Sequence, residues 1–173
     1  HQKASIFYEI SNSLTGFLPS LPVSNELAAL LNLPDSSTIS YYRLVRQTAV
    51  IDKKLAEIQA KNPATYTELD KEIIHSTQHF SGLYAKRGIN ALKIIPPKGL
   101  APGTAGPADE TWRSPWEVLD SPVIDESDRK ILDGLENLVN AYRAMNRAAF
   151  LDSSQRLLTA ITGHPALAPG TAG

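Results

Sequence analysis

Apolar residues recur three and four positions apart along two neighbouring stretches of the chain, a spacing typical of helices that pack through one face. The first stretch, at about 37–61, carries Tyr41, Leu44, Thr48, Ile51, Leu55 and Ile58 in this spacing. The second stretch, at about 65–88, carries Tyr66, Leu69, Ile73, Ser76, Phe80 and Leu83. Because only a short break containing Pro63 separates them, the pattern predicts a long antiparallel helical hairpin.

A third stretch begins near Asp125 and repeats the spacing with Ile131, Leu135, Leu138, Tyr142, Met145 and Ala149. The spacing loses phase at 150–154 and resumes with Leu157, Leu158 and Ile161. Since Asp152-Ser153-Ser154 could start a new helix, the segment 125–162 is read as either one helix or two.

Local signals predict where the other helices begin and end. Residues 3–14 can form a short helix, and Ser24 can cap a second one that runs to Leu33. Residues 35–37 offer caps for the first long helix, and Thr65 with Glu68 forms a capping-box pattern for the second. Because the alternation typical of strands is nearly absent, we expect an all-α fold, an antiparallel helical bundle of three to four long helices with short N-terminal helices.

A repeated heptapeptide, Leu-Ala-Pro-Gly-Thr-Ala-Gly, occurs at 100–106 and again at 167–173. Its composition is that of a linker or tail, because Pro and Gly interrupt helices. We therefore expect an N-terminal helical segment at 1–99, a linker at 100–107, a C-terminal helical segment at 108–166 that packs on the hairpin, and a flexible tail at 167–173. The repeat has three possible origins: a duplicated linker, an added tag, or a terminal sequence shared by two polypeptides.

Composition narrows the classes of function. The chain has 17 Lys and Arg against 18 Asp and Glu, and this balance argues against a dedicated nucleic-acid binder. The charge is uneven, at +3 over residues 1–106 and −4 over 107–173. The absence of Cys excludes disulfides, thiol catalysis and Cys-ligated metals. No apolar run is long enough to span a membrane and no signal peptide is visible, so the cellular location stays unassigned.

The sharpest chemical pattern is Glu72, His75 and His79, in which two histidines four positions apart share one helix face. The Glu-x-x-His spacing occurs in carboxylate-bridged di-metal bundles, but the second such motif is missing. These residues are therefore either candidate metal ligands or an exposed face that carries two histidines. His164, which lies between a helix end and Pro165, is expected to be solvated.

Two further groups are candidate binding residues. Trp112, Arg113 and Trp116 form a segment that can dock a partner, or whose indoles can close one end of the bundle. Arg143 and Arg147 can contribute to a small basic patch, or can be ordinary solvated residues of a helix. The chain carries no nucleotide-binding loop, nucleophile elbow or zinc-protease motif, so we identify no catalytic residue and no cofactor.

The stretch 137–139, followed by 146–154, resembles the end of the last bundle helix in coat proteins of rod-shaped plant viruses. The resemblance implies a four-helix bundle that stacks into tubes around RNA, with Arg143 and Arg147 near phosphate. This chain departs from the family's pattern at Leu151, where the family has Glu, and Asp152 follows one position later.

The sequence as a whole favours a non-enzymatic helical bundle that acts through protein–protein association, as an assembly subunit or scaffold. A metal- or ligand-binding bundle that uses Glu72, His75 and His79 is the first alternative. A coat subunit of a filamentous RNA-packaging assembly is the second.

Overall fold

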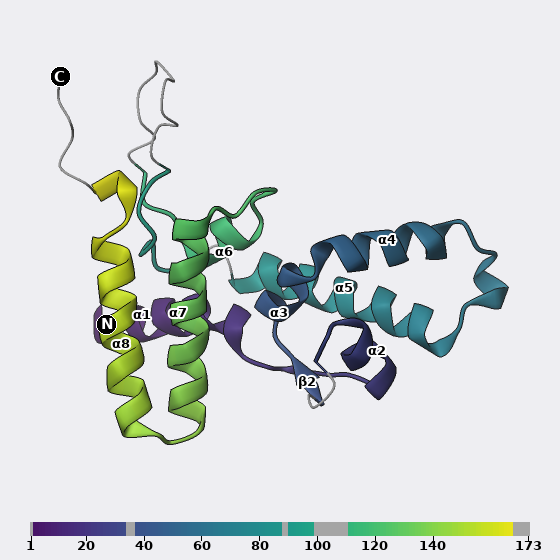
Figure 1. Cartoon of the computed structure of the whole chain (residues 1–173), viewed down its shortest axis with the longest axis horizontal. Helices are drawn as coiled ribbons and strands as arrows, with labels where there is room; N and C mark the ends of the chain where they lie inside the picture. The colour runs from purple at the N-terminus through teal and green to yellow at the C-terminus, as the bar shows by residue number, and fades with distance from the viewer. Residues whose placement is uncertain (1, 34–36, 88–89, 99–110, 168–173) are drawn as a thin grey trace, which may run out of the picture. The chain divides into compact units, whose positions relative to one another are not determined.

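The computed structural model describes residues 2–33, 37–87, 90–98 and 111–167. Eight α-helices, three short 3₁₀ turns and one two-stranded sheet lie in these ranges. They divide into two compact units (Figure 1): unit 1 combines His1–Thr15 with Asn90–Gly173, and unit 2 comprises Gly16–Ile89. The all-α class predicted from the sequence is confirmed.

Unit 2 is built around a helical hairpin. After a 3₁₀ turn at Thr15–Phe17, β1 (Leu21–Pro22) pairs antiparallel with β2 (Thr38–Ile39), and α2 (Asn25–Leu30) lies between them in the chain. The hairpin follows as α3 (Tyr41–Arg46), α4 (Thr48–Gln59), a 3₁₀ turn at Pro63–Thr65 and α5 (Glu68–Arg87). Its core contains Leu21, Leu27, Leu31, Ile39, Leu44, Ile51, Ile58, Ile73 and Phe80. The 3–4 spacing therefore predicted most of the buried face of the hairpin, but Thr48, which it also placed on this face, is exposed.

The predicted start of the first long helix is wrong. Residues 38–39 pair with β1, and the helix begins only after Ser40, whose hydroxyl accepts a hydrogen bond from the amide of Arg43 at 3.2 Å. The helix is also interrupted at Gln47, where the backbone leaves helical geometry (φ −111°, ψ 22°). The caps expected at Asp35 and Ser36 lie outside the described residues.

The capping box of α5 lies two residues later than predicted. The hydroxyl of Thr67 accepts from the amide of Asp70 at 3.1 Å, and the carboxylate of Asp70 accepts from the amide of Thr67 at 3.0 Å. Asp70 also accepts from the ammonium of Lys61 at 2.8 Å. This ammonium, followed by the Thr67 amide, lowers the pKa of Asp70 below its ordinary value. Asp70 therefore joins the end of α4 to the start of α5.

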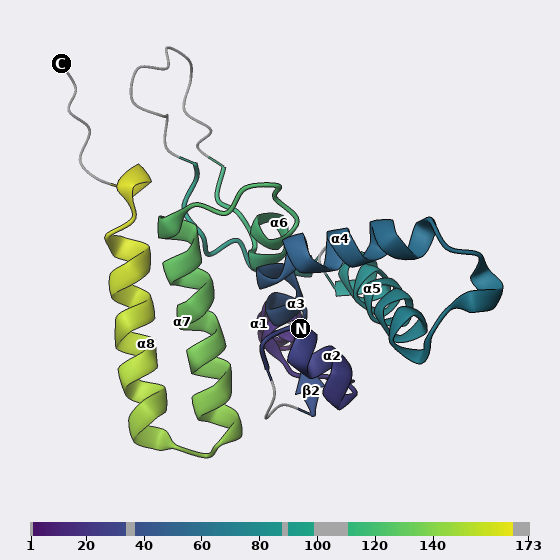
Figure 2. The ribbon, with the colours of Figure 1, turned by 45° about the vertical axis from the view of Figure 1, so that its right-hand side comes forward.

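Unit 1 is discontinuous in sequence. It contains α1 (Gln2–Leu14), α6 (Pro115–Leu119), α7 (Glu126–Arg143), α8 (Arg147–Thr162) and a 3₁₀ turn at Pro165–Leu167. The indole of Trp116 in α6 donates to the carbonyl of Asn12 in α1 at 2.8 Å, and the amide of Leu92 donates to the hydroxyl of Ser13 at 2.7 Å. Helices α7 and α8 lie side by side as an antiparallel pair (Figure 2).

The segment 125–162 is two helices, and they separate at 144–146 rather than at 150–154. Met145 adopts a left-handed backbone (φ 54°), and the side chain of Asn146 then caps α8 by accepting from the amide of Ala149 at 3.0 Å. The predicted packing face changes accordingly, because Ile131 and Leu135 are buried whereas Tyr142 and Met145 are 70% and 87% exposed. Leu132 and Val139 complete the buried face of α7.

The sequence also predicts a single bundle in which the C-terminal segment packs on the first hairpin. This stays a prediction, because it concerns the placement of unit 1 relative to unit 2. The linker at 100–107 and residues 168–173 of the tail lie outside the described residues.

Candidate functional site

The most unusual side chain of unit 1 is Asp128, an acidic residue that is completely buried in the first turn of α7. Asp125 precedes it as the helix cap, and its carboxylate accepts from the amide of Asp128 at 2.9 Å. An acid in the first turn suits the helix dipole, but full burial requires partners that satisfy its charge. Two side chains from other segments surround it.

Arg113 is the first partner. The backbone of Arg113 pairs with that of Ile95 in an isolated β-bridge, and this pairing fixes the start of its side chain. Its two terminal nitrogens donate to the two oxygens of Asp128 at 2.8 and 2.7 Å. The same guanidinium donates to the carbonyl of Pro96 at 2.7 and 3.1 Å. This two-point pairing satisfies both charges and joins the segment around residue 95 to α7.

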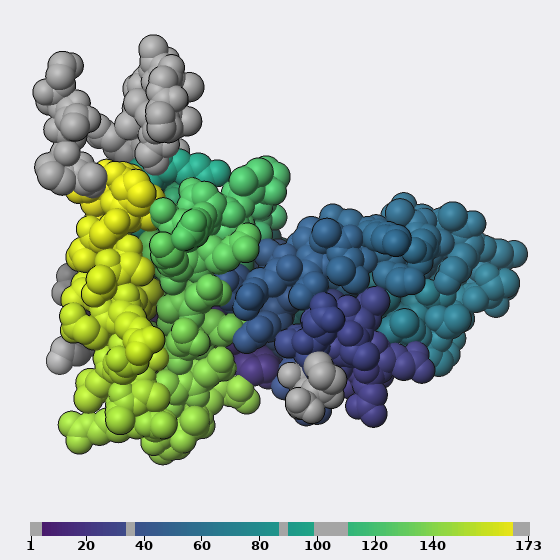
Figure 3. Space-filling view, viewed as in Figure 1, coloured from purple at the N-terminus to yellow at the C-terminus, as the bar shows by residue number. Residues whose placement is uncertain are grey.

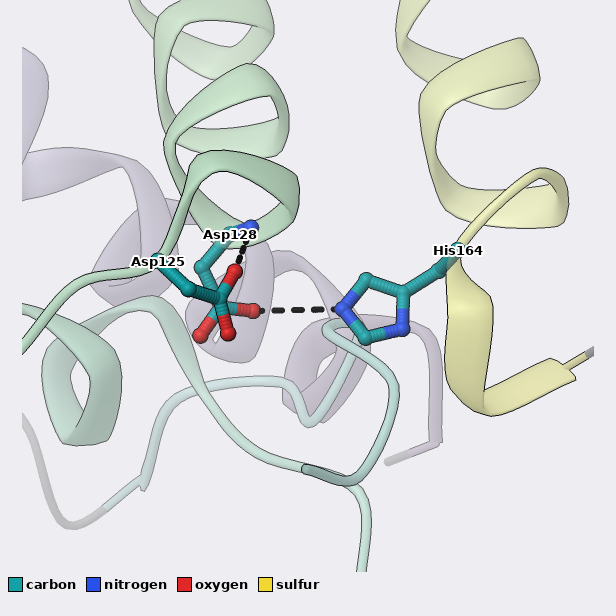
Figure 4. A group of neighbouring side chains, drawn as sticks. All are labelled: Asp125, Asp128 and His164. Atoms are coloured by element: carbon teal, nitrogen blue, oxygen red, sulfur yellow. Dashed lines mark hydrogen bonds and ion pairs between the residues drawn. The ribbon is translucent and has the colours of Figure 1, made fainter. Parts of the chain in front are cut away.

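His164, which follows the end of α8, is the second neighbour of Asp128. The imidazole is only 4% exposed, so the expectation that it is solvated is wrong. Its Nδ1 accepts from the amide of Ala166 at 3.2 Å, and its Nε2 lies 3.4 Å from an oxygen of Asp128 (Figure 4). Nε2 makes no hydrogen bond within the part of the chain that the structure describes. The histidine thereby places the end of α8 against the start of α7.

The ligand atoms of this cluster resemble a metal site, but the central carboxylate of Asp128 is already paired with Arg113. Ligand atoms of Asp125, Asp128 and His164 all lie within 4.8 Å of one another, the only such group of three or more among the described residues. However, both oxygens of Asp128 accept from Arg113, whose fixed positive charge would repel a cation. The arrangement therefore fits a buried polar clamp that holds three segments together.

Glu72, one of the three candidate metal ligands, makes hydrogen bonds within unit 2. One of its oxygens accepts from the amide of Ser24 at 2.7 Å and the other from the hydroxyl of Ser24 at 2.5 Å. The carboxylate thus links the cap of α2 to α5. His75 and His79 are exposed, with ring centres 6.4 Å apart. The metal-site prediction, which stays a prediction, now depends on these two imidazoles.

The three predicted partner-binding residues have different environments. Trp116 is 1% exposed, and Arg113 is occupied by Asp128, whereas Trp112 is 39% exposed. Ser114 between them caps α6 through a reciprocal pair of hydrogen bonds with Glu117. Burial raises the pKa of Glu117, but the hydrogen bonds from Ser114 outweigh it, so the net shift is downward. The docking prediction at this segment therefore rests on Trp112.

Sequence reasoning missed the cluster around Asp128. An acidic residue in the first turn of a helix is normally solvent-exposed, and nothing in the local pattern distinguishes Asp128 from Glu126. Its partners, Arg113 and His164, lie 15 and 36 positions away in the sequence. Two signals were available in the sequence: the position of Arg113 between two tryptophans, and the position of His164 before a proline. Neither signal identifies Asp128 as the partner.

Comparison with known proteins assigns no family to this chain: no family model, curated protein or solved structure matches it. Among the helices that the structure describes, none combines the length and apolar character needed to cross a membrane. Arg143 and Arg147, the candidate phosphate-binding residues, are exposed on either side of the turn between α7 and α8.

Proposed function

We propose that the chain acts through protein–protein association, as an assembly subunit or scaffold. The observation that carries this proposal is the apolar surface of α1 and of the α7–α8 hairpin. Of twelve exposed large hydrophobic residues in the described part of the chain, eight belong to these elements or to the turn that joins the hairpin. They are Ile6, Phe7, Tyr8, Ile10, Tyr142, Met145, Leu151 and Leu158.

The arrangement of these side chains supports the proposal further. At the turn of the hairpin, an open groove of about 300 Å³ is lined by the apolar residues Ala141, Tyr142, Met145 and Phe150, together with Asn146 and Arg147. The ring centres of Tyr142 and Phe150, which both line this groove, lie 6.3 Å apart. Apolar groups gathered at one place on a surface are typical of interaction sites, whereas scattered ones need no explanation. The proposal also includes the single bundle predicted from the sequence, in which the α4–α5 hairpin and the α7–α8 hairpin would associate with each other.

Sedimentation velocity over a wide range of protein concentration tests the proposal. Association that weakens in Tyr142→Glu but persists in Asn140→Glu would support it. Both positions are exposed in the last turn of α7, so the two variants add the same charge in the same helical setting. A protein that is strictly monomeric at every concentration, and identical in both variants, would contradict the proposal.

The two alternatives keep their own tests. Zinc titration followed by calorimetry examines the metal-binding alternative. Zinc affinity that disappears in both His75→Ala and His79→Ala would support it, and zinc affinity unchanged in both would contradict it.

A steep salt dependence of RNA binding that is lost in Arg143→Ala and Arg147→Ala would support the RNA-packaging alternative.

A further inference from the structure

His164 lies where the end of α8 meets the start of α7. Figure 3 shows α8, in yellow, lying along α7, in green, so that the C-terminal end of one helix is beside the N-terminal end of the other. The imidazole is 4% exposed, and its two nitrogens face different segments. Nδ1 accepts from the amide of Ala166 in the turn Pro165–Leu167 at 3.2 Å, whereas Nε2 lies 3.4 Å from Oδ1 of Asp128. The ring therefore lies between its own turn and a carboxylate of another helix.

These contacts determine where the neutral ring carries its proton. A neutral imidazole has one N–H donor and one unprotonated acceptor nitrogen. Because Nδ1 accepts from Ala166, it is the unprotonated nitrogen, and the proton lies on Nε2, which points toward Asp128. Nε2 nevertheless makes no hydrogen bond, and it is the only buried side-chain nitrogen or oxygen in the described part of the chain of which this is true. The neutral ring thus binds its own turn and leaves its contact with α7 incomplete.

The charged groups that face the ring are unbalanced when the ring is neutral. Asp125 and Asp128, at the start of α7, each carry a negative charge, and a carboxylate oxygen of each lies within 4.8 Å of a nitrogen of the ring. Arg113 supplies one positive charge and donates to the same Oδ1 atom of Asp128 at 2.7 Å. Residues 157–163 and 165–167, on either side of His164, contain no charged side chain. A second positive charge, on His164 itself, would balance the two carboxylates.

Protonation of His164 changes its two contacts in opposite directions. The second proton binds Nδ1, which can then no longer accept a hydrogen bond, so two N–H groups would face each other at Ala166. Pro165 has no amide hydrogen, and the turn keeps the hydrogen bond from the amide of Leu167 to the carbonyl of His164, at 2.9 Å. On the other side, the positive ring attracts Oδ1 of Asp128, and Nε2–H becomes a charge-assisted donor. One proton therefore exchanges a contact within the turn for a contact with α7.

We propose that His164 is a pH-dependent switch between these two contacts. In the neutral form it closes the turn Pro165–Leu167 through Ala166, and in the protonated form it releases Ala166 and pairs with Asp128. Imidazole is the side chain that ordinarily titrates near neutral pH, so the switch needs no other ionisable group to change its charge. The switch lies within one copy of the chain and does not depend on the proposed association.

Nuclear magnetic resonance of the full chain, labelled with ¹³C and ¹⁵N, tests the switch during a titration from about pH 8 to about pH 5. Nitrogen chemical shifts distinguish protonated from unprotonated ring nitrogens, and at the upper end they should place the proton of His164 on Nε2. As the ring becomes protonated, the amide of Ala166 should shift and exchange faster with solvent, at the same midpoint as the ring. The carboxyl carbon of Asp128 should respond at that midpoint too, whereas the amide of Leu167 should keep its protection.

Two variants separate the response of His164 from other effects of pH. His164→Asn places an amide oxygen close to the position of Nδ1, so the amide of Ala166 should stay hydrogen-bonded over the whole titration. His75→Asn removes one of the three other histidines, an exposed one on α5, and should leave the response at Ala166 unchanged. Circular dichroism of both variants checks that the helices still form. If His164→Asn does not fold, the titration of the unaltered chain decides the question alone.

Several results would overturn the switch. They are a neutral ring with its proton on Nδ1, a ring that stays neutral until the chain unfolds, and an amide of Ala166 that does not follow the titration of the ring. A response at Ala166 that persists in His164→Asn would have the same meaning. Each of these results concerns a single copy of the chain, so each would leave the proposed association untouched.

Discussion

Replacement of Arg113 by methionine tests whether the cluster around Asp128 holds unit 1 together. Methionine keeps much of the volume of the arginine side chain but removes its charge and all of its donors. The carboxylate of Asp128 is fully buried, so in Arg113→Met it would lose both guanidinium hydrogen bonds without gaining water. The perturbation therefore leaves a buried charge without its counter-ion.

Removal of one partner from a buried ion pair costs about 3–5 kcal/mol of folding free energy. The exposed pair between Lys130 and Glu126, whose side chains are 67% and 83% exposed, provides the contrast. Its loss in Lys130→Met should cost no more than about 0.5 kcal/mol. We expect the first variant to lower the melting temperature by roughly 6–20 °C and the second by about 2 °C or less.

Urea denaturation followed by tryptophan fluorescence is the appropriate assay, because the only two tryptophans, Trp112 and Trp116, both lie in unit 1. The double variant Arg113→Met with Asp128→Leu should recover much of the lost stability, since it removes the unpaired charge. A loss below about 1 kcal/mol in Arg113→Met would refute the reasoning, and so would a double variant that is less stable than the single one.

Three further predictions concern other parts of the fold. Because the pKa of Asp70 is lowered by Lys61, its stabilising contribution is present above its ordinary value of 3.8 and is lost as the pH falls through the depressed pKa. Acid denaturation followed by circular dichroism should therefore be less steep in Asp70→Asn; equal slopes would contradict this. Met145→Gly should raise the free energy of unfolding by about 0.5–1 kcal/mol, because glycine adopts positive φ without strain; a loss of stability in urea would contradict it. Gly134→Val should lower the free energy of unfolding by about 1–3 kcal/mol, because the added side chain forces α7 away from Leu157. An unchanged free energy of unfolding in urea denaturation would refute the close approach of the two helices.

The parts of the fold that the sequence predicted are those fixed by local spacing. Ile51 and Ile58 of α4, and Ile73 and Phe80 of α5, are buried as the 3–4 pattern indicated. The pattern works here because neighbours on one helix face all meet the same surface. It failed at Met145, since neither glycine nor proline marks the turn and a left-handed methionine has no sequence signal.

The contacts that tie distant segments together could not be predicted from the sequence. The spacing around Glu72 suggests a metal ligand, and the structure shows its carboxylate bound to Ser24, 48 positions earlier. The sequence around Arg113 suggests a partner-binding residue, and the structure shows its guanidinium paired with Asp128. The sequence identifies the type of a polar side chain, but only the folded structure identifies its partner. The chemical type of these residues could therefore be predicted, whereas their roles could not.

The division of unit 1 between the two ends of the chain has a consequence for biosynthesis. Its hydrogen bonds from Leu92 to Ser13 and from Trp116 to Asn12 join positions 79 and 104 residues apart. All of residues 16–89 is therefore synthesised before α1 meets its first partner. Closing an unstructured loop of that length costs roughly 4 kcal/mol in chain entropy. If unit 2 folds first, fewer free residues separate α1 from its partners in unit 1. Folding of the inserted unit 2 therefore favours the later assembly of unit 1.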